Sequence, residues 1–285
     1  MRAVKTAFLL TALTLLLVLG GQAIAGRQGM TFGLIIAVAM NGVAYFFSDK
    51  IALMSSGAQP VSREQTPRLY EVMERLAAKA QLPMPKLYMI PQPAPNAFAT
   101  GRNPSHASVA VTAGLMELMN DDELEGVIAH ELSHVRNYDI LITSVAATLA
   151  GAITWIASMG RWAMIFGGYG GSRDNDRGGG GLAALLMLIV APIAALLIQL
   201  GISRQREFAA DASGARMVGH PNGLISALEK LGAYNRRIPM DVPPTTASLF
   251  IVAPLTAGQV FSGLFSTHPP LTERIAVLRN MTITR

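Results

Sequence analysis

The chain has 285 residues, of which 51% are hydrophobic and only 14% charged, and its mean hydropathy is +0.38. A soluble globular chain carries about 25% charged residues, so this composition indicates a membrane protein, and it excludes a disordered one. The absence of cysteine excludes disulfides, thiolate metal ligands and a cysteine nucleophile. The net charge of +5 fits basic residues kept on the cytoplasmic side of a membrane, so we expect no nucleic-acid partner.

Four apolar stretches have the length of membrane spans, because crossing ~30 Å of hydrocarbon takes roughly 20 helical residues. They cover about residues 7–25, 31–53, 140–159 and 182–200. The first two are separated by a very short turn, Gly26 to Met30. A cleaved signal peptide is the alternative for the first stretch, because a basic start precedes it and small residues stand near its end.

Lysine and arginine near the span ends predict that both termini are cytoplasmic. The same rule places the polar regions 55–139 and 201–285 on the cytoplasmic side. A further apolar stretch, 248–265, is interrupted by Pro254, so we expect it to be buried or interfacial rather than to cross.

Hydrophobic spacing predicts the elements of the first polar region. Helical spacing predicts an amphipathic helix over 67–80. Strands are predicted over 86–90, 96–101 and 107–112, the last two joined by a turn. Asn120 or Asp121 is the predicted N-cap of a further helix, which we expect to continue into the third span.

The motif His130-Glu131-x-x-His134 lies on that helix. Two histidines at i and i+4 differ by about 40° around a helix, so both imidazoles can bind one cation. Glu131 lies beside that face, where its carboxylate can act as general base on a water held by the metal. A catalytic zinc needs three protein ligands and one open position, so one more ligand is expected.

Glu207 is the best candidate for the third ligand, and Asp211 follows it by one helical turn. We predict that Asp211 accepts the free N–H of a ligand histidine and fixes its tautomer. An ordinary ion pair with Arg204 or Arg206 is the alternative for Glu207. An out-and-back membrane hairpin over 140–200 would return Glu207 to the side on which His134 lies.

These motifs resemble the HtpX-type membrane metalloproteases, which are related to the CAAX prenyl endopeptidases. The resemblance rests on His130-Glu131-x-x-His134 before one span, Glu207-Phe208-Ala209-Ala210-Asp211 after the next, and Asn96-Ala97-Phe98-Ala99-Thr100-Gly101 upstream. It covers nearly the whole chain. It implies one Zn²⁺ per chain on His130, His134 and Glu207, with Glu131 as the catalytic base. It also implies a bacterial inner-membrane location, a cytoplasmic active site and a role in stress response and protein quality control.

Two further features are candidates for substrate binding and for catalysis. The segment Asn96, Ala97, Phe98 and Ala99 resembles the strand that lies beside the cleft in such proteases, and an exposed edge can bind a peptide as an extra strand. An ordinary hairpin strand is the alternative. His268 is a candidate donor to the tetrahedral oxyanion, and a turn histidine without a catalytic role is the alternative.

The expected fold is a mainly α membrane protein of about four transmembrane helices, with a cytoplasmic α+β zincin-like catalytic domain that carries a small β-sheet. The expected domains are two transmembrane helices (1–54), a first catalytic part (55–139), a transmembrane hairpin with a glycine-rich outer loop (140–200) and a second catalytic part (201–285).

The expected function is a membrane-anchored zinc endopeptidase that cleaves misfolded or damaged membrane proteins and cytosolic segments. The expected partners are polypeptide substrates and the lipid bilayer. A zinc-containing membrane scaffold or holdase without turnover is the alternative. Intramembrane cleavage fits poorly, because charged residues such as Arg136 and Asp139 surround the motif and would be costly inside the bilayer.

Overall fold

The computed structural model describes residues 2–152, 204–235, 237–240, 242–254 and 268–283. The fourth predicted span, the glycine-rich loop and the end of the third span lie outside these residues. The described part is mostly helical with one small mixed sheet, as the sequence predicts.

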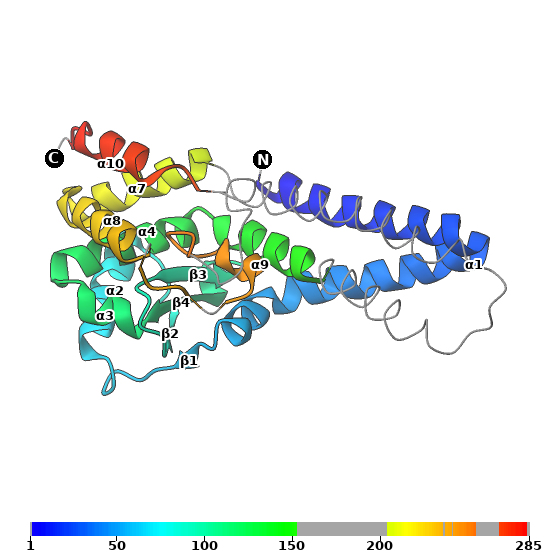
Figure 1. Ribbon diagram of the computed structural model, residues 1–285, viewed down its shortest axis with the longest axis horizontal. Helices are drawn as coiled ribbons and strands as arrows, with labels where there is room; N and C mark the ends of the chain where they lie inside the picture. The colour runs from blue at the N-terminus through cyan, green and yellow to red at the C-terminus, as the bar shows by residue number, and fades with distance from the viewer. Residues whose placement is uncertain (1, 153–203, 236, 241, 255–267, 284–285) are drawn as a thin grey trace.

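An apolar hairpin forms the N-terminal arm of the molecule. Helix α1 (Arg2–Ser55) consists of two helices joined at Ala25 and Gly26, where the backbone leaves the helical region and Gly26 has φ of 57°. The two halves lie side by side and run in opposite directions (Figure 1). This turn lies at the start of the turn predicted from Gly26 to Met30. The halves approach closely at Gly33, where a Cβ would overlap the Leu17 carbonyl.

A third apolar helix, Asp139–Ala152, packs against both halves of this hairpin. Its residues Ile142, Val145 and Leu149 share a buried cluster with Leu13 and Ala44 of α1. Within the described ranges, Ala25–Ser55 is the helix long and apolar enough to cross a membrane, and Thr6–Gln22 and Asp139–Ala152 are shorter apolar helices.

The sheet has the strand order β1-β2-β4-β3. The strands are β1 (Gln59–Pro60), β2 (Lys86–Ile90), β3 (Ala97–Gly101) and β4 (Ala107–Thr112), and a short 3₁₀ turn, η1 (Pro104–His106), precedes β4. Strands β2 and β4 are parallel, whereas β3 pairs antiparallel with β4, which confirms the predicted hairpin. Strand β3 is therefore at one edge of the sheet.

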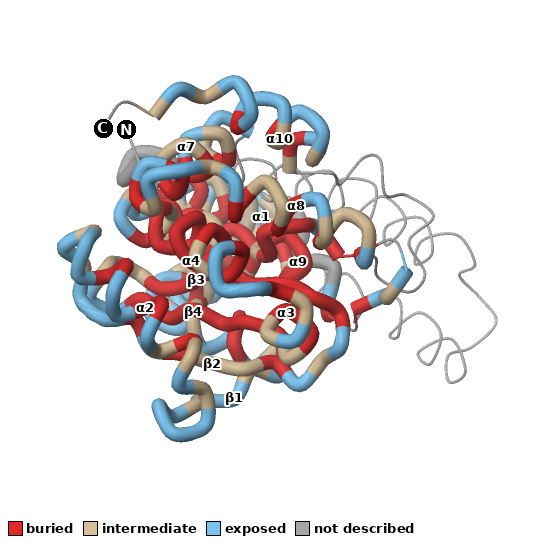
Figure 2. Tube along the Cα trace, turned by 90° about the vertical axis from the view of Figure 1, so that its left-hand side faces the viewer, coloured by how far each residue is buried: buried red, intermediate tan, exposed pale blue. Residues whose placement is uncertain are grey.

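Helix α4 (Asp121–Arg136) lies at the centre of the described part outside the apolar helices, and Figure 2 shows it buried along most of its length. It begins with a capping box between Asn120 and Glu123, and confirms the predicted N-cap at Asn120. It packs against α2 (Pro67–Ala80), α7 (Arg204–Val218), α8 (Asn222–Asn235) and β3. Three short helices complete the described part: α3 (Ala113–Leu118), α9 (Pro244–Ala247) and α10 (Leu271–Arg279).

One expectation about α4 is wrong, because the helix does not continue into the third span. It ends at Arg136, and Tyr138 adopts a left-handed conformation with φ of 57° before the next helix begins at Asp139. This break turns the chain, so that Asp139 lies back beside His134.

Candidate metal centre

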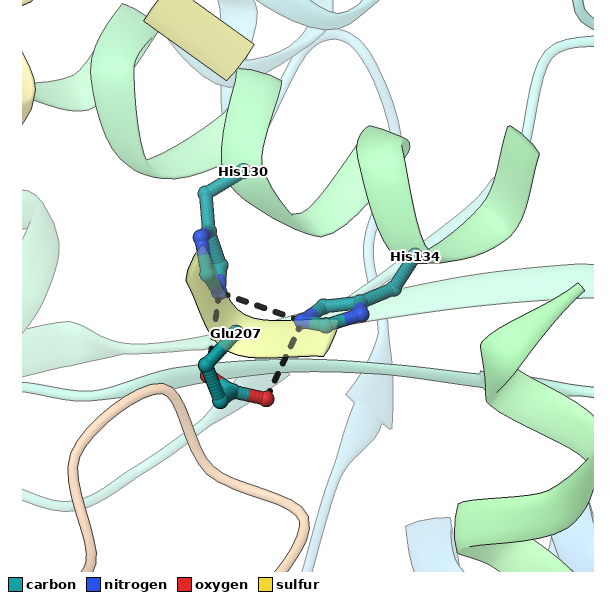
Figure 3. A group of neighbouring side chains, drawn as sticks. All are labelled: His130, His134 and Glu207. Carbon is teal, nitrogen blue, oxygen red and sulfur yellow. Dashed lines mark hydrogen bonds and ion pairs between the residues drawn. The ribbon is translucent and has the colours of Figure 1, made fainter. Parts of the chain in front are cut away.

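Helices α4 and α7 bring His130, His134 and Glu207 together, and one ligand atom from each residue lies within 4.8 Å of the others. The two Nε2 atoms are 3.2 Å apart. Glu207 places Oε2 at 3.7 Å from Nε2 of His130 and Oε1 at 3.5 Å from Nε2 of His134. Figure 3 shows the three side chains pointing at one another. The three residues named from the sequence therefore share one centre.

Carboxylates hold the opposite nitrogen of each imidazole. Asp211 Oδ1 lies 2.9 Å from Nδ1 of His130, and Asp139 Oδ2 lies 3.4 Å from Nδ1 of His134. An imidazole that donates its Nδ1–H in this way keeps the Nε2 lone pair for a cation. Asp211 lies where the sequence analysis expects it. The sequence analysis names Asp139 only as a charged residue near the motif. Its contact with His134 was not predicted, because it depends on the break after α4.

Arg274 was missed by the sequence analysis, although it is completely buried beside this centre. Its Nε and Nη2 donate to the two carboxylate oxygens of Asp211 at 2.8 and 2.7 Å, and its Nη1 lies 3.8 Å from Glu207 Oε2. One signal could have found it. Arg274 shares a helix face with the apolar Leu271 and Leu278, a position at which an unpaired charge would be costly.

The buried charges shift one another's pKa values. Burial alone raises the pKa of Glu207, but His268, His134 and Arg274 outweigh it and hold that pKa well below its usual value. Burial alone lowers the pKa of His134, but Glu207 and other carboxylates raise it to about 9. Burial raises the pKa of Asp211 as well, and Arg274 reverses this to about 2. The pKa of His130 is lowered, chiefly by burial.

The lowered pKa values of Glu207 and Asp211 and the raised pKa of His134 mean that the carboxylates of this site attract positive charge strongly. Two imidazole nitrogens 3.2 Å apart and a carboxylate can share a proton or a cation. Glu207 Oε2 is buried, and its nearest described partners are Nδ1 of His268 at 3.2 Å and Nε2 of His130 at 3.7 Å. Histidine nitrogen and carboxylate oxygen are ordinary ligands of divalent metal ions. The donor set therefore fits a metal ion.

A cavity opens at this centre, and Glu131 lines it together with His130, His134 and Glu207. Its side chain is buried, and burial raises the pKa of its carboxyl to about 7. A backbone hydrogen bond from Ala99 of β3 acts in the opposite direction. The carboxylate thus lies between the histidines and the edge strand.

A short segment, residues 248–252, covers part of that edge, and we refer to it as the wall segment. The Ile251 N–H donates to the Ala97 carbonyl at 2.9 Å. The Asn96 amide donates to the Val252 carbonyl at 2.8 Å. Asn96 and Ala97 therefore bind the chain's own wall segment.

Of the four residues expected to bind substrate, Ala99 is the one that lines the cavity. Phe98 is buried against Phe250, with the ring centroids 4.9 Å apart. The described end of the predicted 248–265 stretch, including Phe250 and Ile251, is buried, and the remainder lies outside the described residues.

His268 also lines the cavity. Its Nδ1 lies 3.2 Å from Glu207 Oε2, and its Nε2 lies 3.3 Å from the Ser248 carbonyl. The cavity wall is completed by residues of the third apolar helix and of the wall segment, namely Ile140, Thr143, Ser248, Leu249, Phe250 and Ile251. His268 is thus beside the third candidate ligand rather than in a remote turn.

The amino-acid sequence is similar to those of known proteins. Residues 63–282 match the model of "Peptidase family M48". A "Protease HtpX homolog" of Desulfatibacillum aliphaticivorans is 58% identical over 96% of this chain and 88% of its own length. Another protein of that name, from Thermodesulfovibrio yellowstonii, is 53% identical over 99% of both chains.

A solved structure supports the fold. The crystal structure of S. mikatae Ste24p matches with a TM-score of 0.54 and 20% identity. The match covers 97% of this chain, which spans only 65% of the Ste24p chain. The family model covers well over half of the chain and includes all of the clustered residues described above. The chain belongs to peptidase family M48, and it is a metallopeptidase.

Proposed function

We propose that this metallopeptidase is a membrane-anchored zinc endopeptidase with one Zn²⁺ per chain, bound by His130, His134 and Glu207. The convergence of these three side chains supports the assignment, as does the carboxylate behind each histidine. Three protein ligands leave one position open for water or substrate, which is the arrangement of a catalytic zinc.

The proposed mechanism assigns a role to each neighbouring group. A bound Zn²⁺ would supply Lewis-acid polarisation of the scissile carbonyl and would lower the pKa of water to about 7. Glu131 removes a proton from the attacking water and delivers it to the leaving amine. Asp211 and Asp139 hold the two imidazoles in orientation. A hydrogen bond from His268 Nε2 to the oxyanion would replace its contact with the Ser248 carbonyl.

The substrate binds as an extended chain beside β3. Ala99 lines the cavity next to Glu131, so a peptide that pairs with β3 there would carry its scissile bond past the metal site. Asn96 and Ala97 bond the wall segment and Phe98 packs against Phe250, so the part of the edge left for a substrate lies at Ala99.

The ends of the apolar helices lie at the cavity. Ile140 and Thr143, in the first two turns of the helix Asp139–Ala152, form part of its wall. Ala52 and Leu53, near the end of α1, share a buried cluster with Phe98 and Phe250. A protein anchored in the same bilayer therefore needs few extended residues, at about 3.3 Å each, to reach the site.

This placement carries our proposal for substrate and location. The substrates are misfolded or damaged membrane proteins and their cytosolic segments, cleaved in protein quality control. The protein lies in the bacterial inner membrane with four spans, with both termini and the active site cytoplasmic. The domains are 1–54 and 140–200 in the membrane, and 55–139 and 201–285 in the catalytic region.

The test uses one cleavable segment in three forms, with purified zinc-loaded protein in lipid vesicles. The segment is joined to an apolar span by a flexible spacer of about 5 residues, by one of about 30 residues, or left without a span. The short-spacer form should be cleaved at least about tenfold faster than the free segment, and the long-spacer form should be intermediate, because effective concentration falls with spacer length. Equal rates for all three would contradict the membrane-proximal substrate.

A further inference from the structure

The side chain of Arg274 is the largest of those buried completely in the described part of the chain. Desolvation of a charge at this depth is costly unless the charge is paired and hydrogen-bonded. Arg274 meets this requirement with two bonds to Asp211 and one, at 2.9 Å, from Nη1 to the Ile251 carbonyl. The guanidinium thus contacts two different parts of the site.

The first part is the metal centre. The fork from Nε and Nη2 to both oxygens of Asp211 fixes the plane of that carboxylate. The oxygen bound by Nη2, Oδ1, is the one that lies 2.9 Å from Nδ1 of His130. Arg274 therefore determines where Asp211 accepts the imidazole N–H, and through it where Nε2 of His130 points.

The second part is the cavity wall. The Ile251 residue whose carbonyl accepts from Arg274 also donates its N–H to the Ala97 carbonyl of β3. Arg274 on α10 and Ala97 on β3 thus hold the same residue from two sides. Loss of the guanidinium would release the wall segment at the point where it meets the edge strand.

Resting on the function proposed above, we propose that Arg274 is a positioning residue of the peptidase, which orients His130 through Asp211 and fixes the wall segment at β3. It does not contact the substrate. Its planar fork is essential, because a lysine ammonium is a point charge that cannot bind both carboxylate oxygens in the same plane.

The test compares R274K and R274Q with R279Q in the full-length protein purified in detergent. Arg279 lies on the same helix, but it is exposed and forms its ion pair with Glu229. Zinc affinity is measured by competition with a chelator. We expect a loss of about 10- to 100-fold in both Arg274 variants and none in R279Q. Hydrogen exchange of the amides in residues 248–252 should become faster in the Arg274 variants alone.

Three results would overturn the proposal. Zinc affinity at the wild-type level in R274K and R274Q would show that the fork does not orient the ligand. Unchanged amide exchange in residues 248–252 would remove the role in the cavity wall. Failure of both variants to fold, beside a folded R279Q, would make Arg274 a stabiliser of the fold. Because neither readout depends on proteolysis, failure of the proposed substrates would leave this test intact.

Discussion

Gly214 of α7 lies directly against the backbone of His130, where a Cβ would come within 3.0 Å of the His130 nitrogen. The two ligand-bearing helices therefore cross at a glycine, about two turns from the ligand Glu207 on the same helix. This close approach lets Glu207 and Asp211 both reach His130. Larger side chains at the crossing must separate the helices.

The substitutions G214A and G214V should therefore weaken zinc binding progressively. In G214A, alanine gains about 1 kcal/mol of helix propensity over glycine, which offsets part of the steric cost, so the free energy of unfolding should change little while zinc affinity falls several-fold. G214V should lower both the free energy of unfolding and the zinc affinity. G42A is the matched control, because a Cβ at Gly42 meets nothing within 4 Å. Wild-type affinity in G214V would show that the crossing does not set the ligand geometry.

Removal of the third ligand should separate metal binding from folding. E207A should lower the bound zinc well below one per chain, because only the two histidines would remain as ligands. The loss of zinc should exceed that in Q205A, a change at a neighbouring exposed residue. Metal content by atomic absorption, after dialysis at fixed free zinc, gives the comparison. Retention of a full equivalent of zinc by E207A would assign the third ligand elsewhere.

The ion pair between the buried Glu123, at the start of α4, and the half-buried Lys230 predicts a pH dependence of stability. Glu123 accepts from Lys230 at 2.7 Å and from Ser226 at 2.6 Å. Burial alone raises the pKa of Glu123, but these partners and the Asn120 N–H lower it below its usual value. A carboxylate with a lowered pKa adds stability above its unfolded pKa and loses this stability as the pH falls through its folded pKa.

E123Q should thus lower the free energy of unfolding by about 1 kcal/mol at neutral pH. The difference from the wild type should shrink as the pH falls below about 4.3, the usual pKa of glutamate in an unfolded chain, towards the lower pKa of the folded protein. Denaturant unfolding in detergent at several pH values measures it, with the exposed E229Q as control. A difference independent of pH would show that the charge of Glu123 is not responsible.

The edge strand is tied to the third apolar helix by a buried hydrogen bond. The Thr100 and Ser144 hydroxyl oxygens are 2.7 Å apart, so S144A leaves the Thr100 hydroxyl without this partner and should cost about 1 kcal/mol. T148A is the control, because the Thr148 hydroxyl binds the carbonyl of its own helix. Thermal unfolding of the two variants distinguishes them, and equal shifts would argue against a specific tie.

Local patterns predicted the elements and the three central residues well, for physical reasons. The helix α2 has the predicted bounds, because Pro67 begins it and its buried residues follow helical spacing. His130 and His134 share a face by their i, i+4 spacing, and Glu207 was the best remaining carboxylate. None of these inferences needed a contact between distant parts of the chain, apart from the return of the chain through the membrane.

What could not be predicted depends on long-range contacts. The turn at Tyr138 requires a left-handed residue that no glycine or proline announces. The bond from Asn96 to Val252 joins residues 156 positions apart, so the wall segment could not be foreseen beside β3. The partner of Arg274 could not be foreseen, because Asp211 lies 63 residues earlier.

The central claim is that Glu131 acts as the base beside a zinc held by His130, His134 and Glu207. The most direct measurement is cleavage of an unfolded protein by the wild type and by E131Q, each purified with the same zinc content. Glutamine keeps the size of the side chain but cannot accept the proton, so we expect E131Q to retain zinc and to lose at least about 100-fold in rate. Cleavage by zinc-loaded E131Q at the wild-type rate would contradict the account.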